Sequence, residues 1–170
     1  ELKEKPFVLE GQVEEYLQEA YTKRLHTRLS QTKVQKRALL EKKIEKIIHH
    51  IDTLENEAEL YVQSDTAKHH GTLVLANLHF IKGYQECVRL MDFEGKEVEI
   101  PLPKEAQTPQ MAANMLFKKS KKLRQKALSV HRQKENLEEK KLFLERLNEM
   151  VESAVDEEEI NILLPKQRQS

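Results

Sequence analysis

Two long stretches of the chain, residues 12–70 and 110–164, contain neither glycine nor proline. Since these two residues are the strongest helix breakers, each stretch can be helical throughout. A helix of about 45 residues is roughly 65 Å long, at about 1.5 Å of rise per residue. The chain therefore has to fold back between the two stretches, and we place this reversal within residues 63–109.

Apolar residues follow a coiled-coil spacing in both stretches. In the first stretch they alternate steps of four and three: Leu40, Ile44, Ile47, Ile51, Leu54, Ala58 and Tyr61. In the second stretch they recur every seven residues: Leu116, Leu123, Val130, Leu137, Leu144 and Val151. Either spacing keeps a narrow apolar stripe on one side of a helix, where it faces a partner helix. We therefore predict that the two helices pair with each other, antiparallel.

The composition favours a coiled coil over a thick globular core, because 34% of the residues are charged and only 5% are aromatic. Lys plus Arg and Asp plus Glu both number 29. No overall field therefore draws the chain to nucleic acid or to an anionic membrane, and a charged partner has to meet a local patch.

The single cysteine, Cys87, excludes an intrachain disulfide and favours a reducing compartment. No run approaches the roughly 20 apolar residues that cross a bilayer. The first residues also lack the order of a signal peptide, in which a basic segment precedes an apolar one. We expect a cytoplasmic protein without membrane contact. Because Glu1 is an unusual natural start, we also expect a piece of a longer protein, monomeric as an isolated chain.

The reversal itself carries turn and strand signals. Asp65 is the expected N-cap of a helix over residues 66–82, which Gly83 ends. The segments CVRLM and KEVEIP then alternate like strands around DFEG, so we predict a hairpin in which Gly95 has positive φ. Thr108 followed by Pro109 marks the start of the return helix.

The predicted fold class is mainly α: a long antiparallel two-helix coiled coil with a small α/β tip made of one helix and a β-hairpin. The predicted division comprises a lead-in over residues 1–22, a first coiled-coil helix over 23–62, the tip over 63–109, a second coiled-coil helix over 110–154, and a short helix and tail over 155–170.

The expected register places Tyr61 near Ala112. An acidic group of the second helix then faces a basic group of the first, which favours the antiparallel orientation. The acidic residues are Glu145, Glu149, Glu152 and Asp156, and the basic residues are Lys23, Arg24 and Arg28.

The same register brings Lys33 and Arg37 opposite Lys140 and Asn136, where packing would favour leucine. We predict a looser, splayed section at this point. The alternative is that the long aliphatic stems extend past the seam and keep their charges in water.

Six cations lie within nine residues without an intervening acid: Lys118, Lys119, Lys121, Lys122, Arg124 and Lys126. Such a run can bind RNA phosphates with release of counterions, or it can be a solvated helix face. A second basic run contains Lys33, Lys36, Arg37, Lys42, Lys43 and Lys46. Because Glu41 and Glu45 interrupt the second run and can pair with its lysines, we interpret it as structural.

The remaining polar residues suggest no catalytic chemistry. The pairs His49–His50 and His69–His70 lack the further ligands of a metal site. Cys87 is expected to be an inward-facing strand residue, buried and inert. Asn77 and Arg89 are candidates for tip structure or partner contact, with Asn77 tying its helix to a backbone group of the tip. No phosphate loop, acid/base pair or triad is visible, so we expect neither enzyme activity nor a cofactor.

Separated blocks of the chain resemble the middle region of the RqcH/NEMF family, also called NFACT and, under an older name, fibronectin-binding protein A. The blocks are HHGTLVLANLHFIKGYQE, IPLP and TPQMAANMLFKKSKKLRQ, preceded by EEYLQEAYTKRL. The matching positions are Gly71, Leu73, Leu75, Ala76, Asn77, Leu78, Gly95, Glu97, Ile100, Pro101, Leu102, Pro109, Ala112, Phe117, Lys118 and Lys119. The chain departs from the family pattern at Thr72, Lys104 and Ser120, where the pattern has Glu, Asp and Tyr.

The resemblance implies that the parent protein binds large ribosomal subunits obstructed by peptidyl-tRNA and promotes untemplated tailing of stalled chains. This segment is then a coiled-coil arm that reaches toward the stalk base, with rRNA and stalk-base proteins as partners. The Lys118 to Lys126 run becomes its RNA-binding surface. Two alternatives are a fragment of a fibronectin-binding surface adhesin and a purely structural, self-associating coiled coil.

Overall fold

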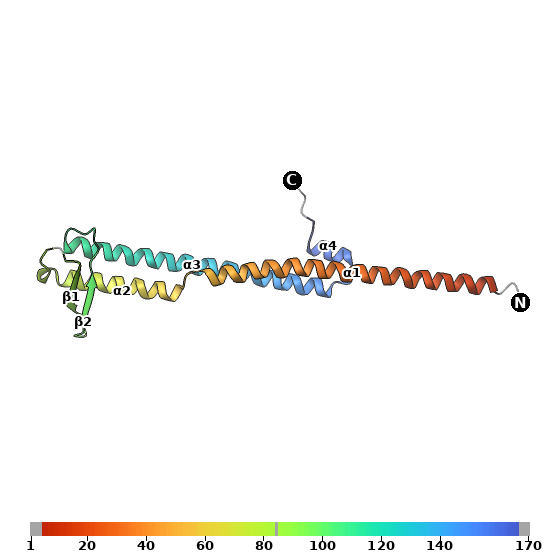
Figure 1. The fold of residues 1–170 in the computed structure, drawn as a ribbon, viewed down its shortest axis with the longest axis horizontal. Coiled ribbons are helices and arrows are strands. Elements are labelled where there is room, and N and C mark those ends of the chain that lie inside the picture. Colours follow the sequence, from red (N-terminus) through yellow and green to blue (C-terminus); the bar gives the residue numbers. More distant parts are fainter. Residues whose placement is uncertain (1–4, 84, 167–170) are drawn as a thin grey trace. The chain divides into compact units, whose positions relative to one another are not determined.

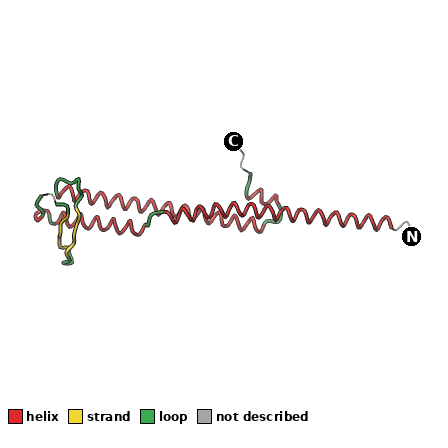
Figure 2. The backbone as a smooth tube through the Cα atoms, viewed as in Figure 1, coloured by secondary structure: helices red, strands yellow, loops and turns green. Residues whose placement is uncertain are grey.

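The computed structural model describes residues 5–83 and 85–166. The elements are α1 (Lys5–Thr53), α2 (Glu57–Ala76), the 3₁₀ helix η1 (Leu78–Phe80), β1 (Cys87–Met91), β2 (Glu97–Pro101), α3 (Pro109–Ser153) and α4 (Glu157–Leu163) (Figure 1). Helices dominate, and the described residues hold one two-stranded sheet (Figure 2). The predicted class, mainly α with antiparallel helix pairing and a small α/β tip, is confirmed.

The chain forms two compact units. We call Thr53–Asn136 the central unit, and we call Glu1–Asp52 together with Leu137–Ser170 the terminal unit. Because the boundaries fall at the end of α1 and within α3, each unit contains its own section of paired helices.

The terminal unit pairs α1 with the last part of α3 and adds α4. Its fully buried side chains come from all three segments: Leu40, Val151, Ala154 and Ile160. Around them pack the partly buried Leu29, Leu144, Leu147, Leu163 and Leu164. The N-cap of α4 is Asp156, whose carboxylate accepts a hydrogen bond from the Glu159 N–H at 2.8 Å. This helix is the short one predicted after residue 155.

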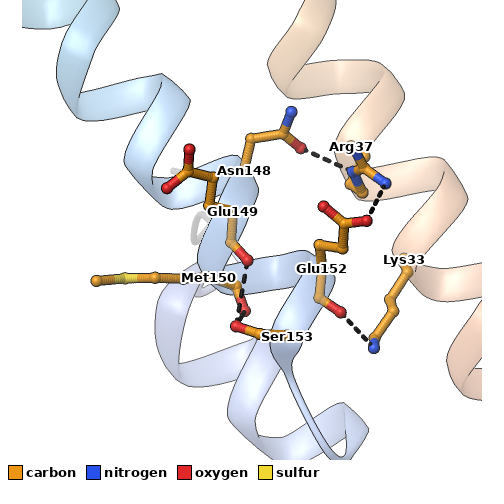
Figure 3. Close-up of polar contacts among 7 residues, drawn as sticks. All are labelled: Lys33, Arg37, Asn148, Glu149, Met150, Glu152 and Ser153. Atoms are coloured by element: carbon orange, nitrogen blue, oxygen red, sulfur yellow. Dashed lines mark hydrogen bonds and ion pairs between the residues drawn. The ribbon is translucent and has the colours of Figure 1, made fainter.

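Polar side chains also join α1 to the last part of α3 (Figure 3). Lys33 Nζ donates to the backbone oxygen of Glu152 at 2.7 Å. Arg37 Nε donates to Asn148 Oδ1 at 3.1 Å, and its Nη1 lies 3.6 Å from Glu152 Oε1. The predicted splayed section is therefore wrong: the two basic residues face acceptors and a carboxylate instead of Asn136 and Lys140.

The sequence pattern predicts one continuous first helix up to residue 62, but the helix is interrupted before that residue. It ends at Thr53, and α2 starts at Glu57 after an N-cap at Asn56, whose side chain accepts the Glu59 N–H at 3.2 Å. The first turn of α2 carries Glu57 and Glu59, which suit the positive end of the helix dipole. The predicted Asp65 cap and the 66–82 helix are wrong because this stronger start signal lies nine residues earlier, at 56 against 65.

In the central unit, α2 and α3 approach closely through small residues. The hydroxyl of Ser64 donates to the Ser120 backbone oxygen and that of Ser120 to the Ser64 backbone oxygen, both at 2.8 Å. A Cβ on Gly71 would lie only 3.0 Å from the Phe117 ring. Ser120 is one of the departures from the family pattern, and it is buried against Ser64. Further along the pair, Leu60, Ala127 and Val130 form a second buried cluster.

The tip core lies where the hairpin covers the end of the α2–α3 pair (Figure 1). Its buried members are Leu73, Val74, Ile81, Val88, Leu90, Ile100, Leu102, Ala106, Ala112, Ala113 and Leu116. Full burial of a Val, Leu or Ile side chain contributes about 1.5–3 kcal/mol. This cluster therefore supplies the apolar free energy that holds the hairpin on the helices.

The predicted hairpin and helix start are confirmed. Strands β1 and β2 pair antiparallel, with Val88 opposite Ile100 and Leu90 opposite Val98. Gly95 has φ of 82°, and the Asp92 carboxylate accepts the N–H groups of Glu94 and Lys96 across the turn. The Thr108 hydroxyl accepts the Met111 N–H at 3.2 Å and caps α3.

The helix register differs from the expected one by twelve residues in each unit. In the terminal unit Lys33 contacts residue 152 instead of 140, and in the central unit Tyr61 contacts residue 124 instead of 112. The expected register assumed that pairing ends near residue 62. It actually continues to the end of α2 at Ala76, so each α1 or α2 residue meets a later part of α3. Acid–base pairing across the terminal unit persists in different pairs, such as Arg28 with Glu157 at 3.5 Å.

Candidate nucleic-acid interface

All six cations predicted as an RNA-binding run lie on α3 within the central unit, and all six are exposed: Lys118, Lys119, Lys121, Lys122, Arg124 and Lys126. They occupy a helix because Lys and Arg lose little rotamer freedom there. The buried Leu116, Ser120 and Ala127 anchor the opposite face of the same segment on α2. The run is therefore a solvent-facing surface held on a rigid helix.

The structure divides the six cations into two groups. Four of them, Lys118, Lys119, Lys122 and Lys126, line a shallow, open groove of about 370 Å³. The floor of this groove contains Met115 and Leu123. Residues three, four, seven and eight apart share one side of an α-helix, which explains why these positions come together. We call these four residues the lysine stripe.

The other two cations lie off the lysine stripe. The guanidinium carbon of Arg124 sits 5.9 Å from the centroid of the Tyr61 ring on α2, a cation–π contact. Lys121 is exposed but does not line the groove that the other four lysines border. Of the six predicted cations, four therefore line this groove and two lie outside it.

One carboxylate reaches the lysine stripe. Glu55, in the connection between α1 and α2, places Oε1 2.8 Å from Lys126 Nζ. About half of each side chain is exposed, at 51% for Glu55 and 54% for Lys126. Sequence reasoning missed this contact because Glu55 is far from Lys126 along the chain and its position depends on the helix break at Asn56.

At its Lys119 end, the lysine stripe lies near His70 of α2. Burial lowers the pKa of His70 from its ordinary value, and the positive charges of His69 and Lys119 lower it further. The neutral form of His70 is therefore favoured, which avoids a further cation beside Lys119.

The two tip candidates have different roles. Asn77 is the C-cap of α2, and its Nδ2 donates to the Leu73 backbone oxygen at 2.8 Å. It thus satisfies the end of its own helix, which corrects the prediction of a bond to a tip backbone group. Arg89 is exposed on the outer face of the hairpin, opposite Glu99, and its role in partner contact stays a prediction.

The prediction for Cys87 is wrong. Val88 and Leu90 point into the tip core, so the alternating strand turns Cys87 outward to solvent. Its thiol donates a hydrogen bond to Glu99 Oε1 at 3.2 Å. This bond raises the pKa of the thiol, with smaller contributions from burial and the Glu99 charge, and so disfavours the reactive thiolate.

Across the described ranges 5–83 and 85–166, no three His, Cys, Asp or Glu side chains gather as a metal site. The rings of His69 and His70 lie 6.5 Å apart. In the second basic run, Lys33 and Arg37 make the contacts to α3 described above. This contribution to the helix pair agrees with a structural interpretation of that run.

The structure is thus a pair of helices with a two-stranded tip, and it presents an exposed lysine stripe on α3. None of the helices in the described residues has the length and apolar character to cross a membrane. Residues 6–164 match the family model for the NFACT N-terminal and middle domains. The chain belongs to the NFACT family, as the resemblance predicted, and this membership suggests a ribosome quality-control type of factor. A search among curated proteins finds no match.

Proposed function

We propose that this chain is the coiled-coil arm of a cytoplasmic ribosome quality-control factor. The arm binds obstructed large ribosomal subunits that carry peptidyl-tRNA and supports C-terminal tailing of the stalled chains. It carries out no chemistry itself. The observation that supports this proposal most directly is the set of exposed cations on α3 in a chain of the NFACT family.

Two surfaces have the properties that ribosome binding requires. The lysine stripe meets rRNA phosphates, which displace condensed counterions and make the affinity depend on salt. The tip offers the exposed Arg89 together with two apolar side chains, Met91 and Phe93, which are 66% and 74% exposed. Exposed aromatic, Met and Arg side chains are enriched at protein interfaces, so the tip suits a stalk-base protein.

The test is co-sedimentation of the chain with purified large subunits over a salt series. We expect binding that weakens steeply as salt rises, and we expect the triple variant Lys118→Glu, Lys119→Glu, Lys122→Glu to lose it. The matched control is Lys42→Glu, Lys43→Glu, Lys46→Glu, which makes the same charge change at exposed positions of α1. Equal binding by the two triple variants, or no salt-dependent binding by the unaltered chain, would contradict the proposal.

A second candidate function is self-association, and one observation favours it. The first part of α1 exposes a series of large apolar side chains: Leu9, Val13, Tyr16, Leu17, Tyr21 and Leu25. Light scattering distinguishes the two candidates, because an arm that acts as one chain remains monomeric at micromolar concentration. A concentration-dependent dimer would favour the structural rod.

A further inference from the structure

The lysine stripe has the chemistry of a surface that binds phosphates without reading bases. Lys118, Lys122 and Lys126 are spaced four residues apart, or about 6 Å along the helix axis. Each ammonium is a compact point charge with three donors, suited to a phosphate oxygen. A row of this spacing can follow successive phosphates along one nucleic acid strand.

The lining of the groove argues against base recognition. Sequence readout uses the fork of Arg or the amides of Asn and Gln, and single-stranded bases stack on aromatic rings. The described residues that line the groove are lysines with Met115 and Leu123, so they offer neither group. Arg124, the one guanidinium in the run, instead lies over Tyr61. The fitting ligand is therefore the backbone of a folded RNA, bound by its phosphates.

Glu55 competes with phosphate for one position of the stripe. Its carboxylate holds Lys126 at 2.8 Å, so it neutralises one of the four ammonium groups and repels an approaching anion. The pair is about half exposed on both sides, and exposed ion pairs are worth little. A phosphate can therefore displace the carboxylate.

We propose that the stripe of Lys118, Lys119, Lys122 and Lys126 binds one row of RNA backbone phosphates, and that Glu55 withholds Lys126 from this row until RNA displaces it. This inference rests on the proposed function and narrows it. It excludes Lys121 and Arg124 from the contact, and it makes Glu55 an internal competitor of the ligand.

The first experiment compares neighbouring single variants for binding a short fluorescent RNA duplex of arbitrary sequence. We expect Lys122→Glu to weaken binding about tenfold and to make the salt dependence shallower, because it removes a phosphate contact. Lys121→Glu, with the same charge change one residue away, is expected to weaken binding less than Lys122→Glu does, because it removes no direct phosphate contact and acts only through the local charge. Both side chains are exposed, and circular dichroism checks that both variants remain helical. An equal loss in both variants would overturn the proposal.

The second experiment tests the competitor. Glu55→Gln frees Lys126, so the duplex should bind about threefold to fivefold more tightly, as expected for an exposed ion pair. The salt slope should steepen by about 0.7–0.9, the contribution of one more phosphate contact. Glu97→Gln on β2 removes the same charge from the tip and should leave affinity and slope unchanged. Unchanged binding by Glu55→Gln would overturn the role of Glu55.

The two proposals fail in different ways. If the chain sediments with large subunits but the RNA duplex does not bind, this inference fails while the proposed function stands. If the duplex binds as predicted but the subunits do not, the stripe binds RNA outside the proposed function.

Discussion

The helix pairs of the two units are held together differently. In the central unit, small residues let α2 and α3 approach until two serine side chains exchange buried hydrogen bonds, and the hairpin adds a continuous apolar core. In the terminal unit, four buried residues are supplemented by polar contacts from half-buried long side chains such as Lys33 and Arg37. Apolar burial contributes more than polar contacts near the surface, so we expect the central unit to be the more stable.

The largest expected effect comes from the tip core. Ile100 is fully buried, and Ile100→Ala should lower the free energy of unfolding of the central unit by about 2–5 kcal/mol through lost burial and a cavity. Native-state hydrogen exchange of α2 and β1 amides measures this loss locally. Val62→Ala, at a position 64% exposed on α2, should change it by less than about 0.5 kcal/mol. If both variants lowered the free energy of unfolding by similar amounts, the tip core would not be the main source of stability in the central unit.

The serine pair tests whether close approach fixes the central register. Ser64→Ala and Ser120→Ala each remove a buried hydrogen bond and should each cost about 1 kcal/mol. Because the two hydroxyls also lie 3.1 Å apart, the double variant should cost less than the sum of the single variants. Urea unfolding of the unaltered chain, the two single variants and the double variant measures the coupling between the serines. Strict additivity would mean that the serines stabilise the pair independently.

The polar seam of the terminal unit should contribute less. Arg37→Ala removes contacts to Asn148 and Glu152, and we expect a loss of about 0.5–1 kcal/mol in hydrogen-exchange stability of the end of α3. The loss should shrink as salt rises, since the Glu152 carboxylate is well exposed. Lys42→Ala, an exposed α1 control, should have no effect. A loss comparable to that of Ile100→Ala would contradict this comparison, because the polar contacts would then stabilise their unit as much as the apolar core stabilises the central unit.

The smallest expected effect depends on pH and involves His131 of the central unit. A hydrogen bond that the His131 imidazole donates to Glu57 raises the pKa of His131 above its ordinary value of 6.5, and the charges of Glu57 and Glu135 raise it further. Because the folded pKa is raised, the stabilisation is fully present below pH 6.5 and is lost as pH rises through the folded pKa. Urea unfolding at pH 6 and pH 8 should show the difference, and His131→Gln should abolish it. NMR titration of the imidazole with an unraised pKa would contradict the contact.

Much of the fold follows from local patterns in the sequence. All predicted seam positions of the second helix, from Leu116 to Val151, are buried or half-buried, because a seven-residue repeat identifies one helix face without knowledge of the partner. The hairpin turn at Gly95 and the cap at Thr108 are likewise local, since each depends on a few neighbouring residues. The family could be recognised for a similar reason, because its blocks occur in order along the chain.

The register could not be predicted in this way. A heptad pattern repeats, so many alignments of two helices bury the same stripe, and the choice depended on where pairing ends. The missed N-cap at Asn56 and the unexpected extent of α2 displaced the predicted partners of Lys33, Arg37 and Tyr61 by twelve residues. The prediction that Cys87 is buried was wrong for a similar reason. Strand alternation leaves open which of the two faces of β1 points inward, and only the packing of the tip core shows that it is the face with Val88 and Leu90.

The sequence by itself determined that this protein consists of long amphipathic helices with a hairpin between them, and that six cations lie on one of these helices. Helical period and turn chemistry act over a few residues, so they can be read from the chain. Only the tertiary structure decided which cations share a groove and that Glu55 lies against Lys126. Those contacts join residues far apart in sequence, and their geometry depends on how the small side chains of α2 and α3 fit together.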